Sequence, residues 1–76
     1  MKLLVLADDL TGALDTGVQF VAGHAATRVL LDPCYPLEKV DPSVQVLVVD
    51  TESRHLPAEE AADIIRGIVR QAAALQ

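Results

Sequence analysis

The sequence predicts an α/β fold in three layers, in which helices cover a mostly parallel, open, Rossmann-like sheet. The apolar run at residues 3–7 lacks polar alternation and is typical of a strand buried on both faces, and residues 44–50 have the β-branched enrichment expected of a strand. Two other segments carry apolar residues at helical spacing. With a third strand between them, the order along the chain is β-α-β-β-α, an alternation that favours a doubly wound sheet.

The first strand is expected at residues 3–7 (LLVLA) and the first helix at residues 10–22. Apolar residues of this helix recur at helical spacing: Leu10, Leu14, Val18 and Val21. Asp15 and Gln19 mark its polar side, so the helix is amphipathic. Gly23 provides a C-terminal stop, because glycine accepts the left-handed conformation that ends many helices.

The second strand is expected at residues 27–32 (TRVLLD) and the third at residues 44–50 (VQVLVVD). Residues 32–44 contain three of the four prolines and have no apolar period. Each proline lacks a backbone donor and biases the residue before it away from helix. This segment is therefore predicted as a connection without a helix.

The last helix is expected to begin at Pro57, with Glu59 and Glu60 in its first turn, where the helix dipole favours negative charge. Its apolar residues form one stripe: Ala61, Ile64, Ile65, Ile68, Ala72 and Leu75. Asp63 and Arg66 are expected to pair on the polar side. Three strands are too few for such a sheet, so we expect an open edge after this helix, where a fourth strand should arrive.

Composition limits the possible functions. The chain has 76 residues, of which 51% are hydrophobic, yet a domain of this size buries only about 60% of its surface. We therefore expect a piece of a larger protein, or a homodimer whose subunits cover each other's open sheet edges. The formal charge of −5, with one Phe and one Tyr, argues against nucleic-acid binding.

The sequence also predicts a cytoplasmic protein. The apolar run before Asp8 is too short for a signal peptide, and no segment approaches the roughly 20 apolar residues of a membrane-spanning helix. The single cysteine, Cys34, cannot form an internal disulfide, as in many proteins of reducing compartments.

Acidic residues are concentrated where a ligand site should lie. In open parallel sheets, ligands bind beyond the carboxyl ends of the strands. Asp8 and Asp9 end the first strand and residues 50–54 follow the third, so both groups reach one crevice if these strands are neighbours. Thr11 and Asp15 share a helix face at the same rim. Three carboxylates repel an uncomplexed phosphate, but they suit the hydroxyls of a polyol or a hard cation such as Mg²⁺.

Simpler roles stay open for several of these residues. Asp9 or Thr11 could serve only as a helix cap, although one cap does not explain three acids. Arg54 could bind a carboxylate bidentately or form an exposed salt bridge with Glu52 or Asp50. Gly12 suits either function or packing, whereas packing is favoured for Gly17. The stretch GALDTG lacks the glycine spacing of a dinucleotide-binding loop and the lysine of a P-loop.

The segments ADDLTGALDTGVQF and VVDTESRHLPAEEA together resemble the N-terminal part of the four-carbon acid sugar kinase family. This resemblance implies transfer of a phosphoryl group from ATP, with Mg²⁺, to the terminal hydroxyl of threonate, erythronate or a 3-oxo-tetronate. It also implies substrate-binding roles for seven residues. Asp8 and Asp9 would meet substrate hydroxyls, and Ser53 and Arg54 would hold the carboxylate. The neighbouring positions are Thr11, Gly12 and Asp15.

On this resemblance, residues 1–76 are expected to be an N-terminal fragment of a sugar-binding domain, without the nucleotide-binding domain and without a site for ATP or Mg²⁺. The fragment alone is expected to be inactive as a kinase. One alternative is a receiver-like signalling domain with an acidic magnesium pocket, in which Asp50 accepts a phosphoryl group. That alternative lacks the Ser or Thr and the Lys that receivers carry on later strands. A non-catalytic interaction fragment is the other alternative.

Overall fold

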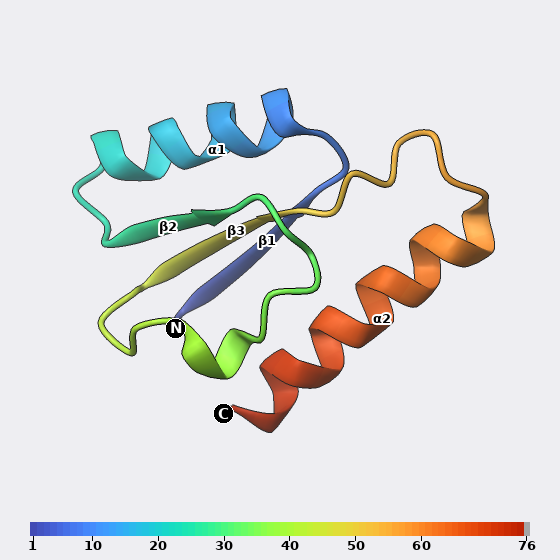
Figure 1. The fold of residues 1–76 in the computed structure, drawn as a ribbon. Coiled ribbons are helices and arrows are strands. Elements are labelled where there is room, and N and C mark those ends of the chain that lie inside the picture. Colours follow the sequence, from blue (N-terminus) through green and yellow to red (C-terminus); the bar gives the residue numbers. More distant parts are fainter. Residues whose placement is uncertain (76) are drawn as a thin grey trace.

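The computed structural model describes residues 1–75 and contains the predicted order of elements (Figure 1). Their bounds are β1 Leu3–Ala7, α1 Leu10–Ala22, β2 Thr27–Leu30, the 3₁₀ turn η1 Leu37–Lys39, β3 Val46–Asp50 and α2 Ala58–Ala74. The limits of β1 and α1 agree with the prediction. β2 and β3 are each two residues shorter than predicted, and α2 begins after Pro57, which is its N-cap rather than its first residue.

The proline-rich connection contains one short helical turn, η1, which the sequence did not predict. Pro36 precedes this turn in an extended conformation, and Val40 closes it by donating its backbone N–H to the carbonyl of Leu37. A turn of three residues needs no apolar period of its own, so periodicity could not reveal it. Its Leu37 side chain is only 3% exposed and belongs to the core.

The three strands form one parallel sheet in the order β1-β3-β2. Leu3 pairs with Val46 and Ala7 pairs with Asp50, so β1 and β3 end level with each other. The first and third strands are therefore neighbours, which was the condition for residues 8–9 and 50–54 to reach one crevice. All five residues of β3 are buried, as expected for the central strand of a sheet covered on both faces.

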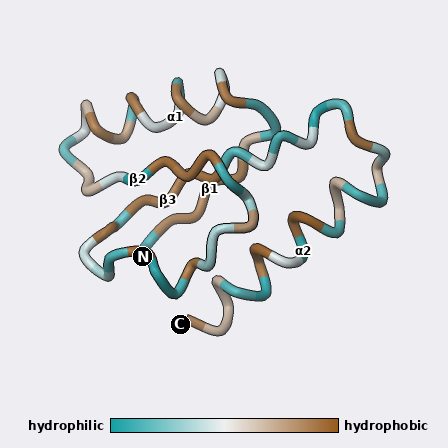
Figure 2. The backbone as a smooth tube through the Cα atoms, in the orientation of Figure 1, coloured by the Kyte–Doolittle hydropathy of each residue, from teal (hydrophilic) through white to brown (hydrophobic). Residues whose placement is uncertain are grey.

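The two helices lie on opposite faces of this sheet, which confirms the three layers (Figure 1). Side chains alternate along β3, so Val46 and Val48 pack with Ala13 of α1. Leu47 and Val49 pack on the other face with Ile68 of α2. Figure 2 shows the mainly apolar strands between these two helical layers.

The apolar stripe of α1 is not its buried side. Its four residues are 42% to 65% exposed: Leu10, Leu14, Val18 and Val21. The helix instead buries Ala13 and Gly17 against the sheet. These small residues let the helix backbone approach closely, and a Cβ built on Gly17 would lie 2.7 Å from a methyl group of Val29. Gly17 thus has the packing role expected for it. The homodimer expected from the apolar composition stays a prediction.

Gly17→Ala should lower the free energy of unfolding by about 1 kcal/mol. Overpacking typically costs about 1–3 kcal/mol, and the higher helix propensity of alanine returns up to about 1 kcal/mol. Val29 is β-branched and cannot easily turn away. The matched control is Gly67→Ala in α2, where nothing lies within 4 Å of the new methyl group, so stability should rise by about 0.5–1 kcal/mol. Urea denaturation measures the change in the free energy of unfolding for both variants. A change of the same sign in both would contradict the packing argument.

α2 packs through part of its predicted stripe. Ile68 is 2% exposed and Ile64 and Ala72 contact the same core, but Ile65 and Leu75 remain 38% and 51% exposed. The predicted ion pair between Asp63 and Arg66 is present on the exposed side. Within residues 1–75, no helix has the length and apolar character needed to cross a lipid bilayer.

Candidate functional site

The candidate site is built where the ends of β1 and β3 are joined by backbone hydrogen bonds. Thr51 donates its N–H to the carbonyl of Ala7 at 2.8 Å. The N–H groups of Ser53 and Arg54 both donate to the carbonyl of Asp8, at 3.0 and 3.2 Å. These hydrogen bonds fix the loop after β3 against the turn between β1 and α1. They bring together the two predicted groups, residues 8–9 and residues 50–54.

Asp9 is the N-cap of α1. Its backbone is extended, with φ −146° and ψ 166°, and its Oδ1 accepts a hydrogen bond from the N–H of Gly12 at 2.8 Å. The capping role considered for Asp9 or Thr11 thus belongs to Asp9. A Cβ on Gly12 would lie 2.9 Å from this same Oδ1, so glycine at position 12 makes room for the cap.

Arg54 lies across both acids of the β1–α1 turn. Its Nη1 is 2.9 Å from Oδ2 of Asp9, and its Nη2 is 3.7 Å from Oδ1 of Asp8. The exposed salt bridge left open as an alternative for Arg54 is present, but its partners are Asp8 and Asp9 rather than Glu52 or Asp50. The side chains of Arg54 and Asp8 are 57% and 56% exposed, so a ligand from solvent can reach both. The site therefore presents a cation and carboxylates side by side.

Thr51 and Ser53 form a buried pair of hydroxyls beneath this surface, 3% and 7% exposed. Their oxygens are 2.7 Å apart, and Oγ1 of Thr51 donates to the carbonyl of Ala7 at 3.0 Å. Because the single proton of Thr51 goes to Ala7, the proton of Ser53 points to Thr51. Ser53 then has only lone pairs to offer. The sequence placed Thr51 in the group at residues 50–54 that reaches the crevice, but it assigned Thr51 no role in the site.

Asp50 and Glu52 form a second carboxyl pair at the same edge. Asp50 is 1% exposed, and its Oδ1 accepts from the N–H of Glu52 at 2.9 Å. Glu52 adopts the left-handed conformation, with φ 49°. A hydrogen bond to the Asp50 carboxyl, together with the negative charges of Asp50 and Asp9, raises the pKa of Glu52. A buried, hydrogen-bonded Asp50 does not suit the accessible phosphoryl acceptor of a receiver domain.

Glu52→Gln should make the stability of the chain less sensitive to pH. Because the pKa of Glu52 is raised above its usual 4.5, the folded state binds more protons than the unfolded state just above that pH. Stability is therefore lost as the pH rises through this window. The melting temperature of the variant should match that of the original chain near pH 4 and exceed it increasingly towards pH 7.

Glu59→Gln is the control for this comparison. Glu59 lies in the first turn of α2, where its negative charge interacts favourably with the helix dipole. This variant should lower the melting temperature slightly at pH 7. An equal melting temperature for Glu52→Gln and the original chain at every pH would contradict the repulsion inferred at Asp50.

Thr11 and Asp15 lie one turn apart on α1 and both have exposed side chains. Within residues 1–75, neither side chain joins the hydrogen bonds or ion pairs that connect the site. Both residues lie in the first two turns of α1, near the rim of the candidate site. Their predicted contacts with substrate stay predictions.

The described residues do not fit a nucleotide or its metal ion. In residues 1–75 there is no group of three or more His, Cys, Asp or Glu side chains arranged to hold a metal. The N-terminus of α1 carries the Asp9 carboxylate, and the first turn of α2 carries Glu59 and Glu60. The carboxylates at the N-termini of α1 and α2 would repel a phosphate group, so neither N-terminus acts as an anion-binding site.

Residues 3–76 match the family model described as the sugar-binding N-terminal domain. The chain is 45% identical over 65 residues to the D-threonate kinase of Salmonella typhimurium, a match that covers 86% of this chain and 15% of the relative. It is 43% identical over 70 residues to the D-threonate kinase of Bordetella bronchiseptica, covering 88% of this chain and 17% of that protein. No solved structure matches significantly. The chain thus spans about a sixth of the length of these relatives.

Proposed function

This chain belongs to the four-carbon acid sugar kinase family through its sugar-binding N-terminal domain, and from that premise we propose that it binds a four-carbon acid sugar such as D-threonate. The single observation that carries the proposal is the exposed contact of Arg54 with Asp8 and Asp9. In this contact a cation that can bind a carboxylate lies beside two acids that can accept hydrogen bonds from hydroxyls. An acid sugar has both complementary groups on one short carbon chain.

Binding would exchange the partners of Arg54. The guanidinium can turn one or both of its N–H pairs towards the sugar carboxylate, which it binds bidentately. Asp8 and Asp9 then accept hydrogen bonds from sugar hydroxyls, with Thr11 and Asp15 at the rim. Ser53, whose proton is used by Thr51, is proposed to accept from a hydroxyl rather than donate to the carboxylate.

Phosphoryl transfer from ATP, with Mg²⁺, is proposed for this family on the names of the two curated relatives. Phosphoryl transfer depends on positioned phosphates and metal. Residues 1–75 do not fit either group, so no step of the transfer is derived for them. The part proposed for this chain is recognition of the sugar.

The test is a titration of the ¹⁵N-labelled chain followed by NMR, with thermal melts in parallel. D-threonate and D-erythronate should raise the melting temperature and shift the amide signals of residues 8–12 and 53–54. Threitol, which has the hydroxyls without the carboxylate, should bind more weakly. The proposal would be overturned if neither acid sugar changed the melting temperature or the amide signals, or if Mg²⁺ alone changed them.

A further inference from the structure

The path of the chain through the sheet defines which edge is open to extension. α1 lies on one face and carries the chain from β1 past β3 to β2. α2 lies on the opposite face, after β3. Crossovers between parallel strands have the same hand in about 98% of cases, so a helix on the opposite face must carry the chain in the opposite direction. From β3, that direction leads past β1 to the free edge of the sheet.

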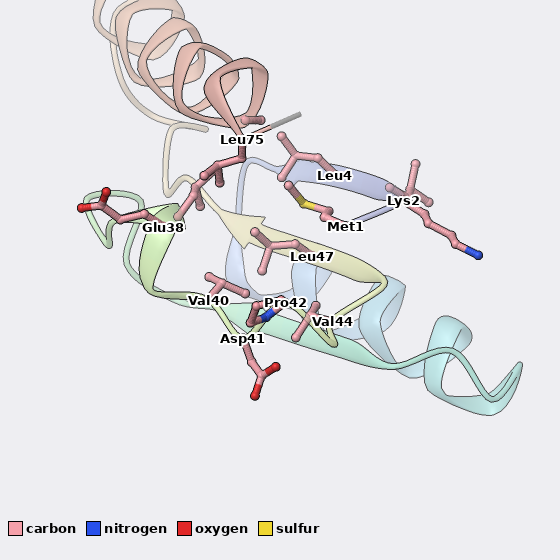
Figure 3. A pocket seen from close by; sticks show the side chains of 13 residues that line it. Met1, Lys2, Leu4, Glu38, Val40, Asp41, Pro42, Val44, Leu47 and Leu75 are labelled. Atoms are coloured by element: carbon pink, nitrogen blue, oxygen red, sulfur yellow. The ribbon is translucent and has the colours of Figure 1, made fainter.

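The end of α2 lies where such a strand would start. Leu75 and Ala72, at the end of α2, line a hollow on the α2 face of the sheet, together with residues 1–4, the connection at residues 37–44 and Leu47 of β3. Figure 3 shows Leu75 across this hollow from Met1 and Leu4. α2 begins at the carboxyl edge of the sheet and ends near the amino edge of β1, so the chain has returned to the level at which a parallel strand begins.

The surface around β1 is apolar and uncovered. Met1 and Leu3 are 48% and 42% exposed. In α2, Ile65 and Val69, 38% and 50% exposed, each follow a residue that packs on the core, Ile64 or Ile68. α2 therefore carries a second apolar ridge beside its buried one, more than a three-stranded sheet requires.

The backbone of β1 also has free hydrogen-bonding groups at this edge. Leu3 donates to Gln45, and Ala7 accepts from Thr51, so the odd-numbered residues of β1 bond to β3. Successive residues of a strand direct their backbone groups to opposite sides, which leaves those of Leu4 and Leu6 at the free edge. On β2, the same argument leaves those of Thr27 and Val29 free, because Ala26 accepts from Val46.

From these observations we propose that the free edge of β1 is the docking site of a further parallel, apolar strand. The occupant is the segment that follows α2 in polypeptides of the length of the curated relatives, of which this chain covers 15% and 17%. The sheet then has the new strand beside β1, followed by β3 and β2. The proposal is independent of sugar binding.

The experiment extends the chain at its C-terminus. The extension is the segment of about 20 residues that follows the equivalent of α2 in the Salmonella typhimurium D-threonate kinase, long enough for a loop and one strand. The matched control carries the same residues in shuffled order. Hydrogen exchange of the ¹⁵N-labelled proteins measures the amides of Leu4, Leu6 and Val29.

Exchange at Leu4 and Leu6 should slow at least tenfold with the native extension and not with the shuffled one, while Val29 is unchanged. Protection of Val29 instead, or none at Leu4 and Leu6, would overturn the proposal. If the extended chain precipitates, the same segment is added as a synthetic peptide to the labelled chain. Unchanged exchange at Leu4 and Leu6 in that format would equally overturn it.

Discussion

Thr51→Val is expected to lower the free energy of unfolding by about 2 kcal/mol. The substitution keeps the shape of the side chain but removes the hydroxyl that donates to Ala7 and accepts from Ser53. The Ser53 hydroxyl then loses its partner in a buried position, and an unsatisfied buried group costs about 1–3 kcal/mol. Urea denaturation of the two proteins measures the difference.

Thr51→Ser is the matched variant, because it retains the hydroxyl and loses only a methyl group. It should recover most of the stability lost in Thr51→Val. The amide shifts of Asp8 and Arg54 add a readout of the site itself, since Thr51 joins the strand ends that hold these residues. They should move in Thr51→Val and stay near their original values in Thr51→Ser. Equal losses in both variants would show that the hydroxyl pair does not position the site.

Local signals in the sequence were sufficient to locate β1 and α1. An apolar run ended by two acids and a capping Asp9 are short-range features, and the observed bounds agree with them. The helix also ends before Gly23 as predicted, but Gly23 has φ −83° and is not left-handed; the left-handed residue is His24, with φ 65°. The buried side of α1 was harder to predict. Periodicity identifies an apolar stripe, but contact with the sheet is made by the small residues Ala13 and Gly17, because they permit the closest approach.

The same distinction applies to the candidate site. The sequence placed Asp8, Asp9, Ser53 and Arg54 at one edge because both strands were expected to end there, and β1 and β3 are indeed neighbours. The pairing of Arg54 with Asp9, rather than with Asp50 or Glu52, depends on the fold of the loop after β3. That loop is fixed by backbone bonds to Asp8 and by the left-handed residue 52, which no spacing in the sequence reveals.

Arg54→Ala is expected to weaken the binding of D-threonate about 10- to 100-fold. Charge-assisted hydrogen bonds contribute about 1.5–3 kcal/mol, and the variant removes the cation proposed to bind the sugar carboxylate. Folding stability should change by less than about 1 kcal/mol, because the ion pairs of Arg54 are exposed. Titration by NMR or calorimetry gives the affinity, and the thermal melt separates it from any loss of folded protein.

Two further variants distinguish the proposed contact from a general effect of charge. Arg54→Lys keeps the positive charge but lacks the planar fork, so its affinity should lie between those of the original chain and Arg54→Ala. Arg66→Ala also removes one positive charge and one exposed ion pair, with Asp63, but on the far side of α2 from the sheet. It should leave affinity unchanged. If Arg66→Ala weakened binding as much as Arg54→Ala, recognition would depend only on the net charge of the chain, and the carboxylate contact at Arg54 would be refuted.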